Sequence, residues 1–479
     1  MNKTDYEIIV GLEVHVELKT ASKIFCSCPT SFGGEPNTQC CPVCLGLPGA
    51  LPTLNRRAVE LAVTAGLALE CDISTYSRFD RKQYFYPDLP KAYQITQNDL
   101  PICRDGALTV HTADGERRIR IQRIHLEEDA GKLVHEGEKT YVDCNRCGVP
   151  LIEIVSCPDI RSGAEAAAYL RALRGVLTAC GVSDCKMQEG SMRCDVNLSV
   201  RRRGVERMGE RTEIKNLNSF AFVEKAISYE ADRQIALLEA GESIQLETRR
   251  FDAATGSTKP MRKKEASEDY RYLREPNLPM LHLTEDEINA VRRRLPELPA
   301  ARAERLCQTF GLPAYDGAVL TSDLALADYF ESAVAATSYP KLLANLLLSD
   351  LLRHCQSDPF ASSVKAERLG ELSQLLGEGT VNSAIAKKLL LRLTAEDFSP
   401  REAAEREQLT QIRDTEVLRT EIHAVLAENP RAVEDYQKGK LAALRALQGK
   451  LMARTGGRAD PVLAESLLKQ EVGKEPETK

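Results

Sequence analysis

The chain has 479 residues, of which 43% are hydrophobic and 28% charged, and its formal net charge at pH 7 is −6. This length exceeds what one hydrophobic core supports, so two to four domains are expected. The negative charge excludes bulk attraction to nucleic acid, and any basic surface must be local. A run of 18 apolar residues is absent, which excludes a transmembrane helix, and the first residues lack the apolar core of a signal peptide. We therefore expect a cytoplasmic protein without membrane contact.

The first predicted strand covers residues 8–18 and includes the segment GLEVHVEL. Its residues alternate between an apolar face and a polar face that carries Glu13, His15 and Glu17. An imidazole between two carboxylates offers nitrogen and oxygen ligands for a divalent cation. An edge strand with a solvated charged face is the alternative that the segment leaves open.

Cysteines gather in the first part of the chain. Cys26 and Cys28 form a CxC pair, and after twelve residues Cys41 and Cys44 form a CxxC pair. This spacing predicts a tetrahedral zinc site of structural type, because four thiolates leave no open position for a substrate. The alternative is a patch of buried thiols, and the adjacent Cys40 leaves the choice of ligands ambiguous.

A second CxxC pair, Cys144 and Cys147, has only Cys157 as a sequence neighbour. We expect ordinary thiols there rather than a second metal site. The 15 cysteines of a chain without an export signal favour thiols and metal binding over a disulfide framework.

Residues 81–91 combine arginine and lysine with three aromatic side chains. This composition suits a segment that holds a nucleotide or an RNA end. An aromatic core turn whose lysines extend to the solvent is an equally weighted alternative.

Acidic residues recur in strand-like surroundings farther along the chain. They are the acids of HLEEDAGK (125–132), Glu153, Asp195 and Glu213. An isolated acid among apolar residues costs desolvation energy unless it is paired or binds a metal. Any single one can be a salt-bridge partner, but the set predicts a metal and phosphate site.

The remaining pattern predicts an α+β fold. Further strands are expected at 107–112, 118–126 and 194–201, and helices at 54–69, 162–180 and 220–240, with Ser162 as an N-cap and Gly181 as a stop. Near residue 295 the composition changes to Ala, Leu, Glu and Arg with a period of 3.6. We expect a mixed-sheet domain at 1–294, with the zinc element at 26–44, an all-helical domain at 295–410 and a small helical tail domain at 411–479.

The tail is predicted to hold helices at 415–429 and 436–453, and a last helix with Asp460 as N-cap and Pro461 in its first turn. Its central part carries six basic residues and no acid: Lys438, Lys440, Arg445, Lys450, Arg454 and Arg458. This local positive charge suits an RNA phosphate backbone, and a solvated helix face is the alternative.

Some motifs are missing. The sequence has no GxxxxGK[ST] loop, no glycine- and serine-rich stretch of the serine amidases, and Asn2 where an N-terminal cysteine nucleophile would stand. ATP would therefore not be bound by a P-loop, and the chain has no recognisable means of releasing ammonia from glutamine.

The sequence resembles the B-subunit family of the aspartyl/glutamyl-tRNA(Asn/Gln) amidotransferases over the first region and, more weakly, to the C-terminus. The blocks that carry the resemblance are GLEVHVEL (11–18), CPVCLGLPGALP (41–52), RKQYFYPDLPKAYQITQ (81–97), HLEEDAGK (125–132), CNRCGVPLIEIVS (144–156), MQEGSMRCDVNLSVR (187–201), EIKNLNSF (213–220) and DYRYLREPNLP (269–279). The resemblance implies a large cradle domain with the active site, a helical domain and a helical tail that contacts tRNA.

The implied activity is ATP-dependent. The side-chain carboxylate of Glu-tRNA(Gln) or Asp-tRNA(Asn) is phosphorylated, and ammonia from a partner amidase then displaces the phosphate to form the amide. The amidase (A) and a small third protein (C) complete the implied heterotrimer. ATP and Mg²⁺ are the implied cofactors, beside the structural Zn²⁺.

By position, the resemblance assigns Mg²⁺ binding to Glu13, His15 and Glu128, with Glu213 binding the same ion or a second one. Lys82 and Tyr84 would bind ATP, and Lys82 would also neutralise charge during phosphoryl transfer.

The resemblance leaves other positions less defined. Glu153 and Asp195 would guide ammonia or hold lysines, and Glu17 would be a bystander. Asn277 stands where the family more often has Asp, which puts a catalytic use of that position in doubt. Two alternatives remain: a non-catalytic tRNA-binding scaffold with a structural acidic cluster, and a metal-dependent nuclease.

Overall fold

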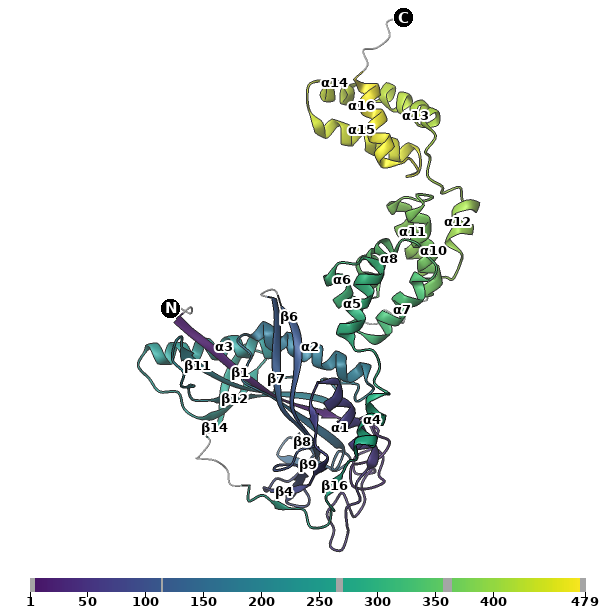
Figure 1. Ribbon diagram of the computed structural model, residues 1–479. Helices are drawn as coiled ribbons and strands as arrows, with labels where there is room; N and C mark the ends of the chain where they lie inside the picture. Colours follow the sequence, from purple (N-terminus) through teal and green to yellow (C-terminus); the bar gives the residue numbers. More distant parts are fainter. Residues whose placement is uncertain (1–4, 113–114, 264–269, 356–363, 474–479) are drawn as a thin grey trace, which may run out of the picture. The chain divides into compact units, whose positions relative to one another are not determined.

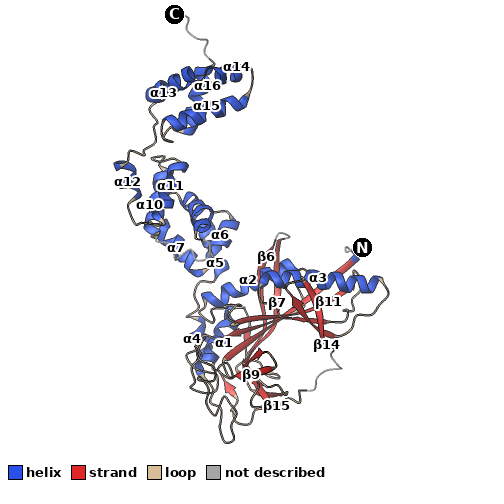
Figure 2. Ribbon diagram, turned by 180° about the vertical axis from the view of Figure 1, so that it is seen from behind, coloured by secondary structure: helices blue, strands red, loops and turns tan. Residues whose placement is uncertain are grey.

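The computed structural model describes residues 5–112, 115–263, 270–355 and 364–473. The chain divides into two compact units, Met1–Pro299 and Ala300–Lys479. The first combines a large mixed sheet with helices and the second is helical where it is described (Figure 2). The expected α+β fold is confirmed, whereas the domain limits at 294 and 410 stay predictions.

A nine-stranded sheet forms the centre of the first unit (Figure 1). Its strands in spatial order are β14 (Ser257–Lys263), β13 (Glu247–Asp252), β12 (Thr212–Lys215), β11 (Met192–Arg202), β1 (Tyr6–Glu17), β10 (Pro150–Ser156), β7 (Gly115–Glu128), β6 (Cys103–Thr112) and β2 (Asp72–Ile73). Neighbouring strands are antiparallel, except that β12 and β13 are parallel. All four predicted strands belong to this sheet.

The first strand is not an edge strand. β1 pairs with β10 on one side and with β11 on the other, so the edge interpretation of residues 8–18 is wrong. The expected alternation is present, since Leu12, Val14 and Val16 are buried and the polar side chains between them lie on the opposite face. Both neighbours follow β1 by more than a hundred residues, which is why local sequence could not reveal them.

Three helices cover the apolar face of the sheet: α1 (Arg56–Ala68), α2 (Gly163–Ala179) and α3 (Phe220–Glu239). They share one hydrophobic core with the strands. The predicted helices and their signals are confirmed: the Ser162 hydroxyl accepts a hydrogen bond from the Glu165 amide, and Gly181 has a φ of 64° just beyond the end of α2.

Short elements lie on the side of the sheet away from α2 and α3 (Figure 1). They are the three-stranded sheet of β15 (Leu273–Arg274), β4 (Asp80–Gln83) and β5 (Tyr93–Thr96), the pair β3 (Tyr76–Ser77) and β16 (Leu281–His282), and the hairpin β8 (Lys132–Glu136) with β9 (Lys139–Asp143). Helix α4 (Glu285–Arg292) follows β16. The polar face of the central strands is therefore the one that these loops and short strands approach.

The second unit contains two hydrophobic clusters, one drawn from residues 306–404 and one from residues 418–472. Its elements are α5 (Pro299–Phe310), α6 (Ala314–Leu320), α7 (Leu324–Val334), α8 (Pro340–Asn345), the π-helical turn η2 (Leu346–Leu351), α9 (Leu352–His354), α10 (Ala366–Gly377), α11 (Ser383–Leu393), α12 (Pro400–Arg406), α13 (Thr415–Glu428), α14 (Pro430–Gln437), α15 (Leu441–Arg454) and α16 (Pro461–Val472). None of the described helices is long and apolar enough to cross a membrane.

One predicted helix is divided. The segment 436–453 belongs to the end of α14 and to α15, and Gly439 between them has a φ of 90°. A left-handed glycine ends the first helix, and Pro430 in the first turn starts it earlier than expected. The N-cap of the last helix is confirmed, because the Asp460 carboxylate accepts hydrogen bonds from the Val462 and Leu463 amides.

Candidate functional site

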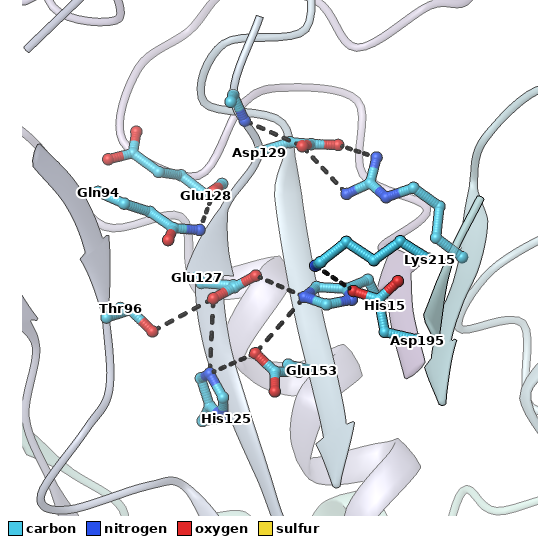
Figure 3. Close-up of polar contacts among 12 residues, drawn as sticks. His15, Gln94, Thr96, His125, Glu127, Glu128, Asp129, Glu153, Asp195 and Lys215 are labelled. Atoms are coloured by element: carbon cyan, nitrogen blue, oxygen red, sulfur yellow. Dashed lines mark hydrogen bonds and ion pairs between the residues drawn. The ribbon is translucent and has the colours of Figure 1, made fainter. Parts of the chain in front are cut away.

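A row of polar side chains crosses four adjacent strands on the face of the sheet opposite the helices. The register pairs Arg193 of β11 with His15 of β1, His15 with Glu153 of β10, and Glu153 with His125 of β7. Paired residues of adjacent strands point to the same face, so that His15, Glu153 and His125 are brought together (Figure 3).

Four members of this region form what we call the histidine–glutamate cluster: His15, His125, Glu127 and Glu153. The His15 Nε2 atom lies 3.6 Å from Glu127 Oε1 and 3.5 Å from Glu153 Oε2. The His125 Nε2 atom lies 3.5 Å from Glu127 Oε2 and 3.4 Å from Glu153 Oε2. Ligand atoms of His15, Glu127 and Glu153 are all within 4.8 Å of one another, so one cation fits between them.

The imidazoles and carboxylates of this cluster shift one another's pKa values. Burial alone lowers the pKa of His15, but the hydrogen bond to Glu153 and the charge of that carboxylate outweigh burial and raise the pKa to about 9. Conversely, burial raises the pKa of Glu153, and the two imidazoles overcome it and hold the pKa well below the usual range. A divalent cation would replace the imidazole protons as the positive charge.

A second group, the three-acid cluster, consists of Glu13, Asp195 and Glu213, whose carboxylate oxygens also lie within 4.8 Å of one another. Lys215 Nζ lies 2.8 Å from Asp195 Oδ2 and 3.1 Å from Glu213 Oε1. Burial raises the pKa of Glu13, and the charge of Glu153 adds to the effect. Three carboxylates beside one ammonium leave excess negative charge that a cation can neutralise.

Neutral side chains hold this second cluster in place. Asn197 Nδ2 donates a hydrogen bond of 2.9 Å to Glu13 Oε1, and Thr248 Oγ1 of β13 donates one of 2.9 Å to Glu213 Oε2. Each donor fixes the orientation of one carboxylate, which is how positioning groups around metal sites act.

Glu128 lies outside both clusters. Its carboxylate accepts hydrogen bonds from Lys91 Nζ and, at 2.9 Å, from the Ile95 amide. Successive residues of a strand point to opposite faces, so Glu127 faces the row with His125 while Glu128 does not. Sequence reasoning counted Glu127 only as one acid of HLEEDAGK, assigned the metal to Glu128 and gave His125 no role, although the period of two along β7 separates Glu127 and His125 from Glu128.

Glu17, expected to be a bystander, belongs to a neighbouring charge group. Arg193 Nη1 and Nη2 lie 2.7 and 3.1 Å from the two carboxylate oxygens of Asp129, and Arg146 Nε lies 3.5 Å from Asp129 Oδ2. Burial, followed by the charge of Asp129, raises the pKa of Glu17 to about 7. No local signal predicted this group, because Asp129, Arg146 and Arg193 are distant along the chain.

Lys82 lies among aromatic rings. Its Nζ atom is 4.8 Å from the ring centroid of Tyr270 and 5.7 Å from that of Tyr84. The Tyr270 ring centroid lies 6.0 Å from that of Tyr272, and burial raises the pKa of Tyr272 to about 12, with the charges of Glu153 and Glu127 adding to it. Phe85 and Tyr86 are exposed by 85% and 57%, which excludes the interpretation of this segment as an aromatic core turn.

The predicted cysteine element is assembled. The Sγ atoms of Cys26, Cys28, Cys41 and Cys44 lie within 4.8 Å of one another, and those of Cys41 and Cys44 are 4.0 Å apart. Tetrahedral zinc with bonds of about 2.3 Å requires sulfur separations of about 3.8 Å, so the set fits zinc. Cys40 is not part of it, and its thiol donates a hydrogen bond of 3.2 Å to the Asn37 carbonyl. A hydrogen bond from Cys26 lowers the pKa of Cys44 to about 4.

Family models match both parts of the chain. The GatB/GatE catalytic domain matches residues 8–289 and the GatB domain matches residues 328–472. The chain belongs to the GatB family. A protein of Moorella thermoacetica, named as the B subunit of aspartyl/glutamyl-tRNA(Asn/Gln) amidotransferase, is 50% identical over 97% of this chain and 99% of its own length. Proteins of the same name from Caldicellulosiruptor saccharolyticus and Clostridium botulinum (strain Eklund 17B / Type B) are 48% and 47% identical over 98% of this chain and their full length.

In the tail of this GatB-family chain, acidic side chains offset part of the positive charge that the sequence predicted. Acids of α13 and α14 pair with three of the six predicted RNA-binding residues: Lys438 with Glu434 at 3.3 Å, Lys440 with Asp435 at 2.9 Å, and Arg454 with Glu421 at 2.6 Å and Glu428 at 2.9 Å. Arg458 Nη1 donates to the Gln408 carbonyl at 3.1 Å. Arg445 and Lys450 are exposed on α15 and are the strongest remaining candidates for phosphate contacts.

Asn277, the position at which the resemblance put a catalytic use in doubt, lies in the loop after β15. Its backbone amide donates a hydrogen bond of 2.8 Å to Glu275 Oε1, and its side chain is exposed. Asn277 therefore contributes a backbone hydrogen bond within the loop, and it belongs to neither the histidine–glutamate cluster nor the three-acid cluster.

Proposed function

We propose that the chain is the B subunit of an aspartyl/glutamyl-tRNA amidotransferase. Its first unit would use ATP to phosphorylate the side-chain carboxylate of Glu-tRNA(Gln), Asp-tRNA(Asn) or both, and would then catalyse the displacement of phosphate by ammonia. The observation that carries this proposal is that the histidine–glutamate cluster and the three-acid cluster lie on one face of the sheet, in a chain whose full-length relatives bear that name.

Two divalent cations are proposed for these clusters. One would be held by His15, Glu127 and Glu153, and the other by Glu13, Asp195 and Glu213. Mg²⁺ bound at these sites would neutralise the negative charge of the phosphate oxygens when the substrate carboxylate approaches ATP. Glu128, assigned to Mg²⁺ by the resemblance, is better placed to hold Lys91, and the contacts of His15 favour Glu127 in its stead.

The side chains around the clusters have complementary tasks. The attacking carboxylate is ionised at neutral pH and needs no general base for the first step. Lys215 and Arg193 border the clusters, and Lys82 lies among aromatic rings, so that these cations would attract and orient phosphate oxygens. Tyr84 and its neighbouring rings would pack against the nucleotide base.

The four cysteines are proposed to bind one structural Zn²⁺, and none of them belongs to the histidine–glutamate cluster or the three-acid cluster. Ammonia would come from a partner amidase (A) in a complex with a small third protein (C), because the sequence lacks recognisable glutaminase motifs. The tail would bind the misacylated tRNA, and the cytoplasmic location stays a prediction.

The test is co-expression with the amidase partner from the same genome, followed by amidation assays on both misacylated tRNAs. Formation of Gln-tRNA(Gln) or Asn-tRNA(Asn) that requires ATP supports the proposal. Amidation that persists when each cluster has lost one carboxylate, in Glu127→Gln/Glu213→Gln, would instead indicate a scaffold role, and tRNA cleavage by the purified chain would indicate a nuclease.

A further inference from the structure

A lysine is completely buried beside the four-cysteine element. Lys23, three residues before the first cysteine, has an exposed fraction of 0%. Burial of an ammonium group costs several kcal/mol unless a counter-charge and hydrogen-bond acceptors are present. The surroundings of its Nζ atom must therefore explain why a lysine stands there.

The Nζ atom makes two hydrogen bonds within the described residues. It donates to Cys44 Sγ at 3.5 Å and to the Cys144 carbonyl at 3.4 Å. Neither is a carboxylate, and no ion pair joins Lys23 to an acid of the described residues. The sulfur of Cys44 is thus the one group in hydrogen-bond contact with the ammonium, among the described residues, that can carry negative charge.

A neutral thiol would be a poor partner for this cation, because it is a weak acceptor and leaves the buried charge uncompensated. Four cysteine thiolates around Zn²⁺ carry a net charge of about −2, of which one unit would be neutralised by an adjacent ammonium. The Cys41 amide also donates to Cys44 Sγ, at 3.1 Å, so this sulfur accepts hydrogen bonds from a backbone amide and from the ammonium. Such donors stabilise a metal-bound thiolate.

We propose that Lys23 is the internal counter-ion of a zinc-bound four-cysteine site and donates a hydrogen bond to the Cys44 thiolate. This inference rests on the proposed structural zinc. Lys23 would be a positioning residue that stabilises the charged metal site, and zinc in turn would make burial of its ammonium favourable.

The same lysine connects the metal site to the strand that carries the acids. Through the Cys144 carbonyl it contacts the loop 144–149, in which the Gly148 amide donates to the Asp129 carbonyl at 2.9 Å and the Asp129 amide donates to the Val149 carbonyl at 2.9 Å. Asp129 directly follows β7. Zinc would therefore stabilise the end of β7 without touching substrate.

The test uses the full-length chain, purified with zinc, and the variants Lys23→Met and Lys19→Met. Methionine fills a similar volume without charge, and Lys19 is an exposed lysine of the same segment that serves as the matched control. Zinc content is measured by elemental analysis, zinc release by transfer to the chelator 4-(2-pyridylazo)resorcinol, and stability by the Tm with zinc and after its removal.

Wild type and Lys19→Met are expected to hold about one zinc per chain. Lys23→Met should release zinc about 10- to 100-fold faster, as expected when a neighbour of a metal ligand is lost. Its metal-free form should be at least as stable as the metal-free wild type, because an uncompensated buried charge is gone. The rise in Tm on adding zinc should therefore be smaller than in wild type.

Equal zinc release and an equal zinc-dependent rise in Tm in Lys23→Met and wild type would overturn the inference alone. A wild-type protein that binds no zinc would overturn the zinc site itself and the inference with it. If Lys23→Met does not fold, Cys44→Ser is compared with Lys23→Met/Cys44→Ser. The double variant should be more stable than Cys44→Ser, and equal or lower stability would overturn the inference.

Discussion

His15 and Glu153 face each other across the adjacent antiparallel strands β1 and β10, with the imidazole Nε2 atom 3.5 Å from the carboxylate Oε2 atom. A shift of the register by one residue would turn one of the two side chains into the hydrophobic core. The buried alternation of β1, in which Val14 and Val16 are 0% exposed, opposes such a shift. Burial of apolar side chains on one face therefore maintains the geometry of the acids on the other.

The structure distinguishes two adjacent glutamates that the sequence could not. Glu127→Gln should lower the rate of ATP-dependent amidation by about 100-fold or more, because a charged group at the proposed phosphoryl-transfer site is lost. Glu128→Gln should retain Mn²⁺ affinity, because its carboxylate pairs with Lys91 instead. The measurement is amidation kinetics together with Mn²⁺ binding. If Glu128→Gln loses Mn²⁺ binding and Glu127→Gln keeps it, the metal ligand is Glu128 and not Glu127.

Two separate clusters predict two divalent-cation sites. Wild type should bind about two Mn²⁺ ions, and His15→Gln and Glu213→Gln should each abolish one of them. Electron paramagnetic resonance of free Mn²⁺ during titration gives the number of sites, and Glu136→Gln, on the exposed hairpin β8–β9, is the control. A single site that both variants remove would show that the two clusters bind one shared ion.

Cation binding at the histidine–glutamate cluster should depend on pH. The pKa of His15 is raised from 6.5 to about 9, so the proton competes with the metal throughout the neutral range. Affinity should therefore increase by up to about 10-fold per pH unit until pH is near 9. Isothermal titration with Mn²⁺ between pH 6.5 and 8.5 measures this slope, which should be missing in His15→Gln because that variant keeps only the site at the three-acid cluster. An unchanged slope in that variant would assign the proton to another group.

The same shift affects the metal-free protein. Because the folded state raises the pKa of His15, its contribution to stability is fully present below pH 6.5 and is lost as the pH rises through about 9. The Tm of the metal-free wild type should accordingly decrease over that range relative to His15→Gln. Parallel Tm profiles for the two proteins would contradict the raised pKa.

Thr248 is expected to orient Glu213. Thr248→Val removes the donor to the carboxylate, and the loss of one hydrogen bond to a charged group should weaken Mn²⁺ binding about 10-fold. Thr248→Ser keeps the hydroxyl and should restore the affinity. Equal losses in the valine and serine variants would indicate a packing effect of the side chain.

Ion pairing in the tail predicts which basic residues bind tRNA. Arg445→Ala/Lys450→Ala should raise the KM for tRNA and reduce the slope of log KM against log salt by about 2, one for each phosphate contact. Lys438→Ala/Lys440→Ala should have a smaller effect, because both lysines already pair with acids of α14. If neither pair of substitutions changes KM, the tail does not bind the tRNA backbone.

Local sequence was sufficient for much of the fold. The alternation in 8–18 predicted the two faces of β1, the N-caps Ser162 and Asp460 predicted the starts of α2 and α16, and the short cysteine spacings predicted a set of four. Each of these signals acts within a few residues along the chain. The divided helix at Gly439 shows where such a signal was present and overlooked.

The sequence by itself determined that Glu13, His15 and Glu17 share a face, because alternation is a property of a single strand. It did not determine which acids meet. Only the tertiary structure placed β10 and β11, more than a hundred residues away, on either side of β1, and so brought Glu153 to His15 and Asp195 to Glu13. Strand order and register depend on burial across the whole sheet, and that is why Glu127 rather than Glu128, and a buried Lys23 beside Cys44, became visible only in the folded protein.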